Sequence, residues 1–139
     1  MGTGKFVPGP AGNDGTSGAA LEIKRGDKFV SEQGLPAASF IKIDAEGFEP
    51  QVFAGLEEVF RRDQPVVLAE TLQDAQAGFG DFAGLKKCFD GARFFSIEPA
   101  AWRDGYRIVE LTDSFGFETL IVPPKHAGII RDFLSPEDR

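Results

Sequence analysis

The stretch Phe40-Ile-Lys-Ile-Asp44-Ala-Glu-Gly47-Phe-Glu-Pro50 decides the fold. Residues 40–43 have strand character and run into Asp44. A short acidic turn containing Gly47 then leads to Pro50, which suits the first position of a helix. A strand that turns tightly into a helix predicts an α/β unit, in which ligands bind at the carboxyl end of the strand. The same acids could instead serve only as caps of the helix N-terminus.

The segment after Pro50 predicts an amphipathic helix followed by a second buried strand. Apolar residues recur at helical spacing until Asp63, and residues 66–70 form a continuous apolar run that ends in Glu70. A right-handed crossover would place the two strands side by side. We therefore expect Asp44 and Glu70 at the same edge of one sheet.

The remaining sequence predicts one domain over residues 21–134, between a flexible Gly- and Pro-rich segment (1–20) and a polar tail (135–139). The fold class is α/β, with parallel strands closed by an antiparallel pair and helices packed on the sheet. The further elements that we expect are a strand at 21–24, a helical turn at 29–32, a loop at 71–80, a helix at 82–89, strands at 93–97, 106–111 and 117–122, and a last helix at 125–134. Residues 112–116 are typical of the turn of an antiparallel pair.

Composition and charge exclude several classes of protein. The net charge of −7 argues against binding nucleic acid or an anionic membrane, and no apolar run reaches the ~20 residues of a membrane span. Cys88 is the only cysteine, so no intramolecular disulfide can form and the cytoplasm is the simplest compartment. With His126 as the only histidine, the usual ligand set of a zinc site is missing. The fourteen Phe residues suggest core packing more than a polar binding surface.

Paired carboxylates are the candidate chemistry of the chain. Asp44 and Glu70 could bind a ribose, orient a substrate hydroxyl or take its proton. Lys42 alternates onto the same face as Asp44, so the other interpretation is a half-buried pair in which the lysine neutralises an acid. A third hypothesis, a Mg²⁺-dependent hydrolase, is weaker because no further Asp or Glu motif accompanies these acids.

The segments 41–49 and 64–70, with Val52 and Gly55-Leu56 between them, resemble the FkbM family of S-adenosylmethionine-dependent O-methyltransferases. The family pattern there is close to I-K-I-D-x-E-G-x-E, then V-x-x-G, then R-P-x-x-x-x-E. Weaker similarity extends the resemblance over about residues 20–125. It implies the latter half of a Rossmann-like methyltransferase sheet and methyl transfer to a hydroxyl of a sugar or natural product. It also implies catalytic roles for Asp44 and Glu70.

By the same resemblance, the residues that would contact S-adenosylmethionine are Asp44, Glu46, Gly47 and Glu49. The family's cofactor turn of D-x-G-A-N-x-G type does not occur in this sequence. We therefore expect this chain to be incomplete as an enzyme and to bind the cofactor weakly. The alternative hypothesis is a non-catalytic acidic α/β module that binds a partner, or itself as a homodimer, through an exposed edge of the strand at 40–43.

Overall fold

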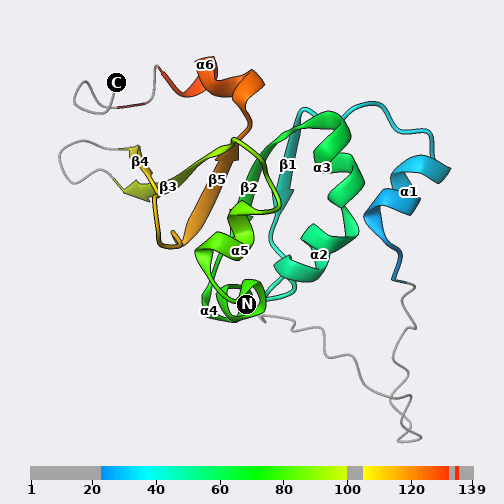
Figure 1. Cartoon of the computed structure of the whole chain (residues 1–139), viewed down its shortest axis with the longest axis horizontal. Helices are drawn as coiled ribbons and strands as arrows, with labels where there is room; N and C mark the ends of the chain where they lie inside the picture. Colours follow the sequence, from blue (N-terminus) through cyan, green and yellow to red (C-terminus); the bar gives the residue numbers. More distant parts are fainter. Residues whose placement is uncertain (1–22, 100–104, 132–133, 135–139) are drawn as a thin grey trace, which may run out of the picture.

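The computed structural model describes residues 23–99, 105–131 and 134, and the predictions for residues 1–20 and for the tail lie outside these ranges. The described part forms a five-stranded sheet with the order β1-β2-β5-β3-β4 (Figure 1). The strands are β1 (Phe40–Ile43), β2 (Val66–Glu70), β3 (Arg93–Pro99), β4 (Tyr106–Glu110) and β5 (Glu118–Val122). Ile23 and Lys24, the described half of the first predicted strand, are not in a strand.

The predicted parallel pair is confirmed. β1 lies beside β2 in parallel, with Phe40 opposite Val66 and Ile43 opposite Ala69. The two faces of β2 are covered to different degrees. Val67 and Ala69 are fully buried, while Val66, Leu68 and Glu70 on the other face are partly exposed. The carboxyl ends of β1 and β2 therefore lie at the same edge of the sheet.

The predicted hairpin around residues 112–116 is wrong. β5 does not pair with β4 but lies between β2 and β3, antiparallel to both, and β4 pairs only with β3. The physical reason is burial. β5 carries the fully buried Thr119 and Ile121 and so needs neighbours on both sides, whereas β4 has no buried residue and serves as an edge. The chain is α/β as predicted, but its sheet is mostly antiparallel.

The helices differ from the prediction at several points. They are α1 (Gly26–Glu32), α2 (Glu49–Gly55), α3 (Glu57–Asp63), α4 (Gln73–Phe79), α5 (Phe82–Lys86) and α6 (Ala127–Ile130), with a 3₁₀ turn η1 (Pro124–His126). The predicted loop at 71–80 contains α4, which buries Ala75 and is joined to β2 by a hydrogen bond from Gln76 Nε2 to the Thr71 carbonyl. The last helix is split into η1 and α6.

The predicted helix after Pro50 is broken at Leu56 into α2 and α3. The start of α1 packs there so closely that a Cβ on Gly26 would lie 2.3 Å from Leu56 Cδ2. Asp27 then accepts hydrogen bonds from the N–H groups of Glu58 and Val59, at 3.3 and 3.0 Å. A side chain from α1 therefore caps the N-terminus of α3, which has no side-chain cap of its own.

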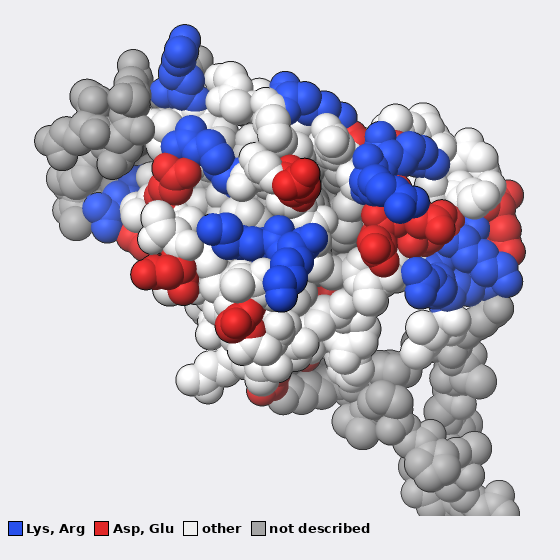
Figure 2. All heavy atoms as spheres, in the orientation of Figure 1, with Lys and Arg blue, Asp and Glu red and all other residues white. Residues whose placement is uncertain are grey.

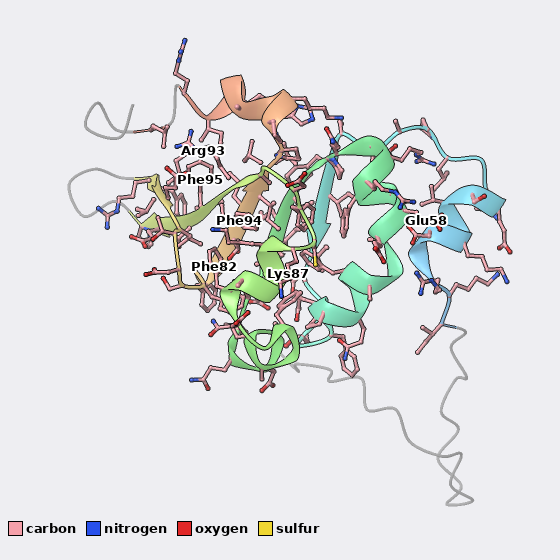
Figure 3. The ribbon with its side chains drawn as sticks, viewed as in Figure 1. Glu58, Phe82, Lys87, Arg93, Phe94 and Phe95 are labelled. Atoms are coloured by element: carbon pink, nitrogen blue, oxygen red, sulfur yellow. The ribbon has the colours of Figure 1, made fainter. Side chains whose placement is uncertain are left out.

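The core has one cluster on each face of the sheet. The larger cluster contains phenylalanines of α2, α3, α5, β3 and the segment after α5 in edge-to-face or tilted contacts, such as Phe53 with Phe89 at a centroid distance of 5.6 Å. The smaller cluster includes Phe95 of β3 and Ile130 of α6. Phe94 and Phe95 are neighbours in β3 and divide between the two clusters (Figure 3). Six phenylalanines serve core packing in these two clusters, whereas Phe29, Phe40, Phe48 and Phe117 are exposed.

Candidate functional site

Three carboxylates form a row across three neighbouring strands. Ile43 is opposite Ala69, so the next residues, Asp44 and Glu70, follow in step at the ends of β1 and β2. Glu70 is directly opposite Glu118, the first residue of β5. Because paired residues on neighbouring strands point to the same face about 5 Å apart, the carboxylate row (Asp44, Glu70, Glu118) concentrates negative charge at one end of the sheet.

The charges that act on the Glu70 carboxyl show which residues make up this acidic end. Burial raises the pKa of the Glu70 carboxyl, and the negative charges of four further acids raise it in addition. The acidic end therefore consists of five carboxylates, namely Asp44, Glu46, Glu49, Glu70 and Glu118. A carboxyl group with a raised pKa in such a place is a candidate for accepting and returning a proton.

Lys42 is the cation of this region. Its Nζ lies 3.1 Å from Asp44 Oδ2, and its pKa is raised by that hydrogen bond and by the charge of Asp44, with smaller contributions from Glu118 and Glu70. The side chains of Lys42 and Asp44 are 57% and 46% exposed. The pair is therefore a solvated surface contact rather than the half-buried structural pair that the sequence left open.

The turn after β1 has an unusual backbone. Glu46 and Gly47 both have positive φ, at 52° and 96°, and the turn closes with a hydrogen bond from Phe48 N to Ala45 O at 3.1 Å. Glycine suits this conformation, whereas a glutamate adopts it at a cost. Asp74 of α4 lies against the turn, since a Cβ on Gly47 would be 3.0 Å from Asp74 Cβ. The turn holds the exposed Glu46 carboxylate at the acidic end.

Glu49 occupies a different position from the other acids. It is only 1% exposed, and its Oε1 accepts a hydrogen bond from Ala45 N at 2.8 Å. This bond closes the turn that precedes α2, and α2 itself has no side-chain cap. Its Oε2 is buried and has no partner among the described residues. A buried oxygen without a hydrogen-bond donor lowers the stability of the folded state.

Glu118 is the site residue that the sequence analysis missed. The residue stands at the start of a correctly predicted strand, but the wrong hairpin placed that strand away from β2. Two buried hydroxyls fix the true neighbourhood. Thr71 Oγ1 donates to Gly116 O at 2.6 Å and lies 2.8 Å from Thr119 Oγ1. These contacts join the end of β2 to the start of β5 and keep Glu70 opposite Glu118.

A cavity lies apart from the acidic end. It measures about 580 Å³ and opens between the α2–α3 pair and the segment around α4 and α5, with Phe60, Arg61 and Lys87 among its lining residues. Cys88 also lines it, and burial followed by the charge of Glu57 raises the pKa of this thiol. On the face in view in Figure 2, basic and acidic side chains are interspersed.

The described residues show neither a metal site nor a membrane span. Within residues 23–99, 105–131 and 134, His, Cys, Asp and Glu side chains form no group of three or more that could hold a metal ion. Among the same residues, no helix is both long enough and apolar enough to cross a bilayer. The carboxylates of the acidic end are therefore spread more widely than a coordination sphere.

Comparison with known proteins identifies one family. Residues 18–85 match the family model described as the methyltransferase FkbM domain, which confirms the family predicted from the sequence. The match contains β1, the acidic turn, α2, α3 and β2, and it ends before β3. No curated protein and no solved structure matches the chain.

Proposed function

We propose that this chain, whose residues 18–85 match the methyltransferase FkbM domain, acts in methyl transfer from S-adenosylmethionine to a hydroxyl of a sugar or natural product. One observation carries the proposal. The family match includes the two strands whose ends bring Asp44 and Glu70 together, next to an open acidic turn. The acceptor is a small molecule, and the lone thiol of Cys88 fits a cytoplasmic protein.

The acidic end has the chemistry that such a cofactor requires. S-adenosylmethionine carries a sulfonium charge and ribose hydroxyls, both of which suit carboxylate partners, and it supplies the electrophilic methyl group when bound. Asp44 and Glu46 are exposed and could accept hydrogen bonds from the ribose. The buried Glu49 carboxylate and the partly exposed Gly47 shape the turn that carries Asp44 and Glu46.

Asp44 and Glu70 are the residues that we assign to the reacting hydroxyl. Asp44 would accept its hydrogen bond and hold the oxygen in line with the methyl group, which is the positioning that accelerates such a displacement. The proton leaves the oxygen as the new C–O bond forms. Because the pKa of Glu70 is raised, this carboxylate is a better proton acceptor than an ordinary glutamate.

Activity measurements test the assignment directly. Methyl incorporation from labelled S-adenosylmethionine into a panel of hydroxyl acceptors should fall about a hundredfold in Asp44→Asn, the usual cost of misplacing a reacting atom. Glu58→Gln is the matched control, because Glu58 is an exposed acid on α3, on the side toward α1 (Figure 3). Equal rates in Asp44→Asn and the wild type would contradict the role of Asp44.

Cofactor affinity is a separate prediction. The sequence contains no D-x-G-x-N-x-G turn, whose glycines let the backbone approach such a cofactor closely. We expect titration calorimetry on this chain to show binding weaker than micromolar. Micromolar binding would mean that the acidic end and its turn hold the cofactor without that motif.

A second candidate function is self-association through β1, the outer strand of the described sheet. Ser39 O accepts a hydrogen bond from Val66 N, so the backbone groups of Ser39 face β2. Because the N–H and C=O groups of successive strand residues face opposite sides, those of Ile41 also face β2 and those of Phe40 and Lys42 face outward. The Phe40 side chain is 56% exposed. An outer strand with unpaired donors and an exposed aromatic residue can pair with a second copy in a symmetric dimer.

Two substitutions at one position test this pairing. Phe40→Pro removes the outward N–H group, whereas Phe40→Val removes the ring and keeps the donor. In sedimentation velocity, we expect a dimer for the wild type and for Phe40→Val, and a monomer for Phe40→Pro. A monomeric wild type at high concentration would exclude this function.

A further inference from the structure

We propose that the acidic end of the sheet binds an organic cation, a protonated amine or guanidinium carried by the methyl acceptor, with Glu70 and Glu118 as its principal partners. The substrate class rests on the proposed function, but the cation site itself does not. The site is built by β2 and β5, and Glu118 lies outside the residues that match the family.

The first support is an uncompensated pair of like charges. Glu70 and Glu118 are directly opposite each other in antiparallel strands, an arrangement that destabilises a sheet. The same sheet compensates such positions elsewhere, since Glu98 is directly opposite Arg107 and bonds to it at 2.8 Å. At the acidic end, the hydrogen bond of Lys42 goes to Asp44, and within the described part of the chain no salt bridge is formed to Glu70 or Glu118.

The second support is the buried oxygen of Glu49. Its side chain reaches the acidic turn, because its Oε1 accepts a hydrogen bond from the N–H group of Ala45, the residue directly after Asp44. Oε1 is satisfied by Ala45 N, whereas Oε2 has no donor among the described residues. A buried carboxylate oxygen without a donor adds to a negative field that a bound cation would relieve.

The spread of the carboxylates selects the kind of cation. A divalent metal ion needs several oxygens at 2.0–2.6 Å, and the described residues contain no group that close. An ammonium or guanidinium group instead donates several N–H bonds, each about 2.7–2.9 Å long, to acceptors spaced around it. Residues paired across neighbouring strands are about 5 Å apart at the backbone, so the carboxylates of Glu70 and Glu118 can accept from different N–H groups of one such cation.

A matched pair of polyols tests the proposal without any methyl donor. N-methylglucamine carries a protonated amine at neutral pH, and sorbitol has the same chain of hydroxyls without the charge. We expect N-methylglucamine to shift the amide NMR signals around Glu70 and Glu118 with an affinity at least about tenfold above that of sorbitol. The difference should shrink as sodium chloride is added. Equal affinities for the two compounds would overturn the proposal.

Variants identify the carboxylates. Glu70→Gln and Glu118→Gln should each weaken N-methylglucamine about two- to fivefold, the range of partly exposed ion pairs, while Glu58→Gln should leave it unchanged. Glu49→Gln removes the buried negative charge and keeps an oxygen to accept from Ala45 N, so it should weaken N-methylglucamine. If Glu58→Gln lost as much affinity for N-methylglucamine as Glu118→Gln, the net charge of the protein alone would explain the effect. That result would contradict the assignment of Glu118.

Competition separates this proposal from its rivals. Magnesium chloride at matched ionic strength should not displace N-methylglucamine, and neither should S-adenosylhomocysteine. Displacement by magnesium would assign the carboxylates to a metal, and displacement by S-adenosylhomocysteine would assign them to the cofactor. Either result overturns the acceptor site. Methyl transfer is measured separately, so loss of the cation site leaves the proposed function open to its own test.

Discussion

The buried carboxylates of Asp63 and Glu49 are nearly equal in exposure, at 4% and 1%, but they differ in their partners. Asp63 accepts hydrogen bonds from Ala38 N at 2.9 Å and from Arg62 Nε and Nη2 at 2.5 and 2.7 Å. Asp27, at 9% exposure, accepts from the first turn of α3. Glu49 has one donor for two oxygens.

The difference separates acids that hold the fold from acids that are available for chemistry. Asp63 joins the end of α3 to the segment before β1, and its main-chain oxygen also receives a hydrogen bond from Lys125 Nζ. Every oxygen of Asp27 and Asp63 therefore has a donor. The acidic end keeps carboxylates that are close together and short of donors, which is unfavourable for stability and suitable for binding a positively charged group.

The largest effect is expected from Asp63→Ala. The substitution leaves Ala38 N without an acceptor and Arg62 without its partner, so the free energy of unfolding should fall by about 2–4 kcal/mol. Urea denaturation measures the change. Glu58→Ala, at an exposed position, should stay within about 0.5 kcal/mol of the wild type. If Asp63→Ala also changed the free energy of unfolding by less than about 0.5 kcal/mol, Asp63 would not be an acid that holds the fold.

Asp27→Ala should have the next largest effect. It removes the cap of α3, and losing such a cap costs about 1–2 kcal/mol. Hydrogen exchange gives a local measurement, because the amides of Glu58 and Val59 should exchange about 5- to 30-fold faster. Unchanged exchange at these two amides, with a loss of stability elsewhere, would show that Asp27 acts through packing.

The pH dependence of the free energy of unfolding should show the contribution of the Asp63 carboxylate. Its folded pKa is lowered, chiefly by the hydrogen bond from Arg62, so the folded state holds this proton less tightly than the unfolded chain. The stabilisation is present above the ordinary aspartate pKa and is lost as the pH falls through the lowered folded value. The free energy of unfolding should therefore decrease more steeply on acidification in the wild type than in Asp63→Asn. Parallel curves would contradict this.

Glu70→Gln should have the smallest effect, with the opposite sign. The folded pKa of Glu70 is raised, so its ionised form disfavours the folded state above that pKa, and the penalty disappears as the pH falls toward the ordinary glutamate value. The substitution should stabilise the protein by less than about 1 kcal/mol at neutral pH and have no effect in acid. Melting temperatures at the two pH values test this, and destabilisation at neutral pH would show that Glu70 holds the fold.

The sequence predicted the half of the fold in which local pattern and connection rules agree. The apolar run 66–70 and the strand 40–43 determine their own pairing, because a helical crossover permits only one simple arrangement. The position of β5 could not be predicted in the same way. Strand 117–122 follows a typical turn, and local preference favours a hairpin, whereas the burial of Thr119 and Ile121 on a central strand is a tertiary effect.

The candidate site shows the same division. Asp44, Glu46 and Glu70 are visible in the sequence because each stands at the end of a strand or in the turn after it. Glu118 depends on a contact between residues 48 positions apart in sequence, so no local pattern indicates it. The missing donor of Glu49 Oε2 is likewise a property of the packed structure. Helix α4 was missed because its seven residues lack an apolar stripe and bury only Ala75.

The left-handed backbone at Glu46 has a consequence for protein engineering. A search for thermostable variants would select Glu46→Gly or Glu46→Asn early, because both residues tolerate the φ of 52° better than glutamate does. Each replacement would also remove a negative charge from the acidic end. A library screened for heat tolerance alone would therefore evolve away from the proposed binding site, while one screened for ligand binding would test whether Glu46 is retained despite its cost in stability.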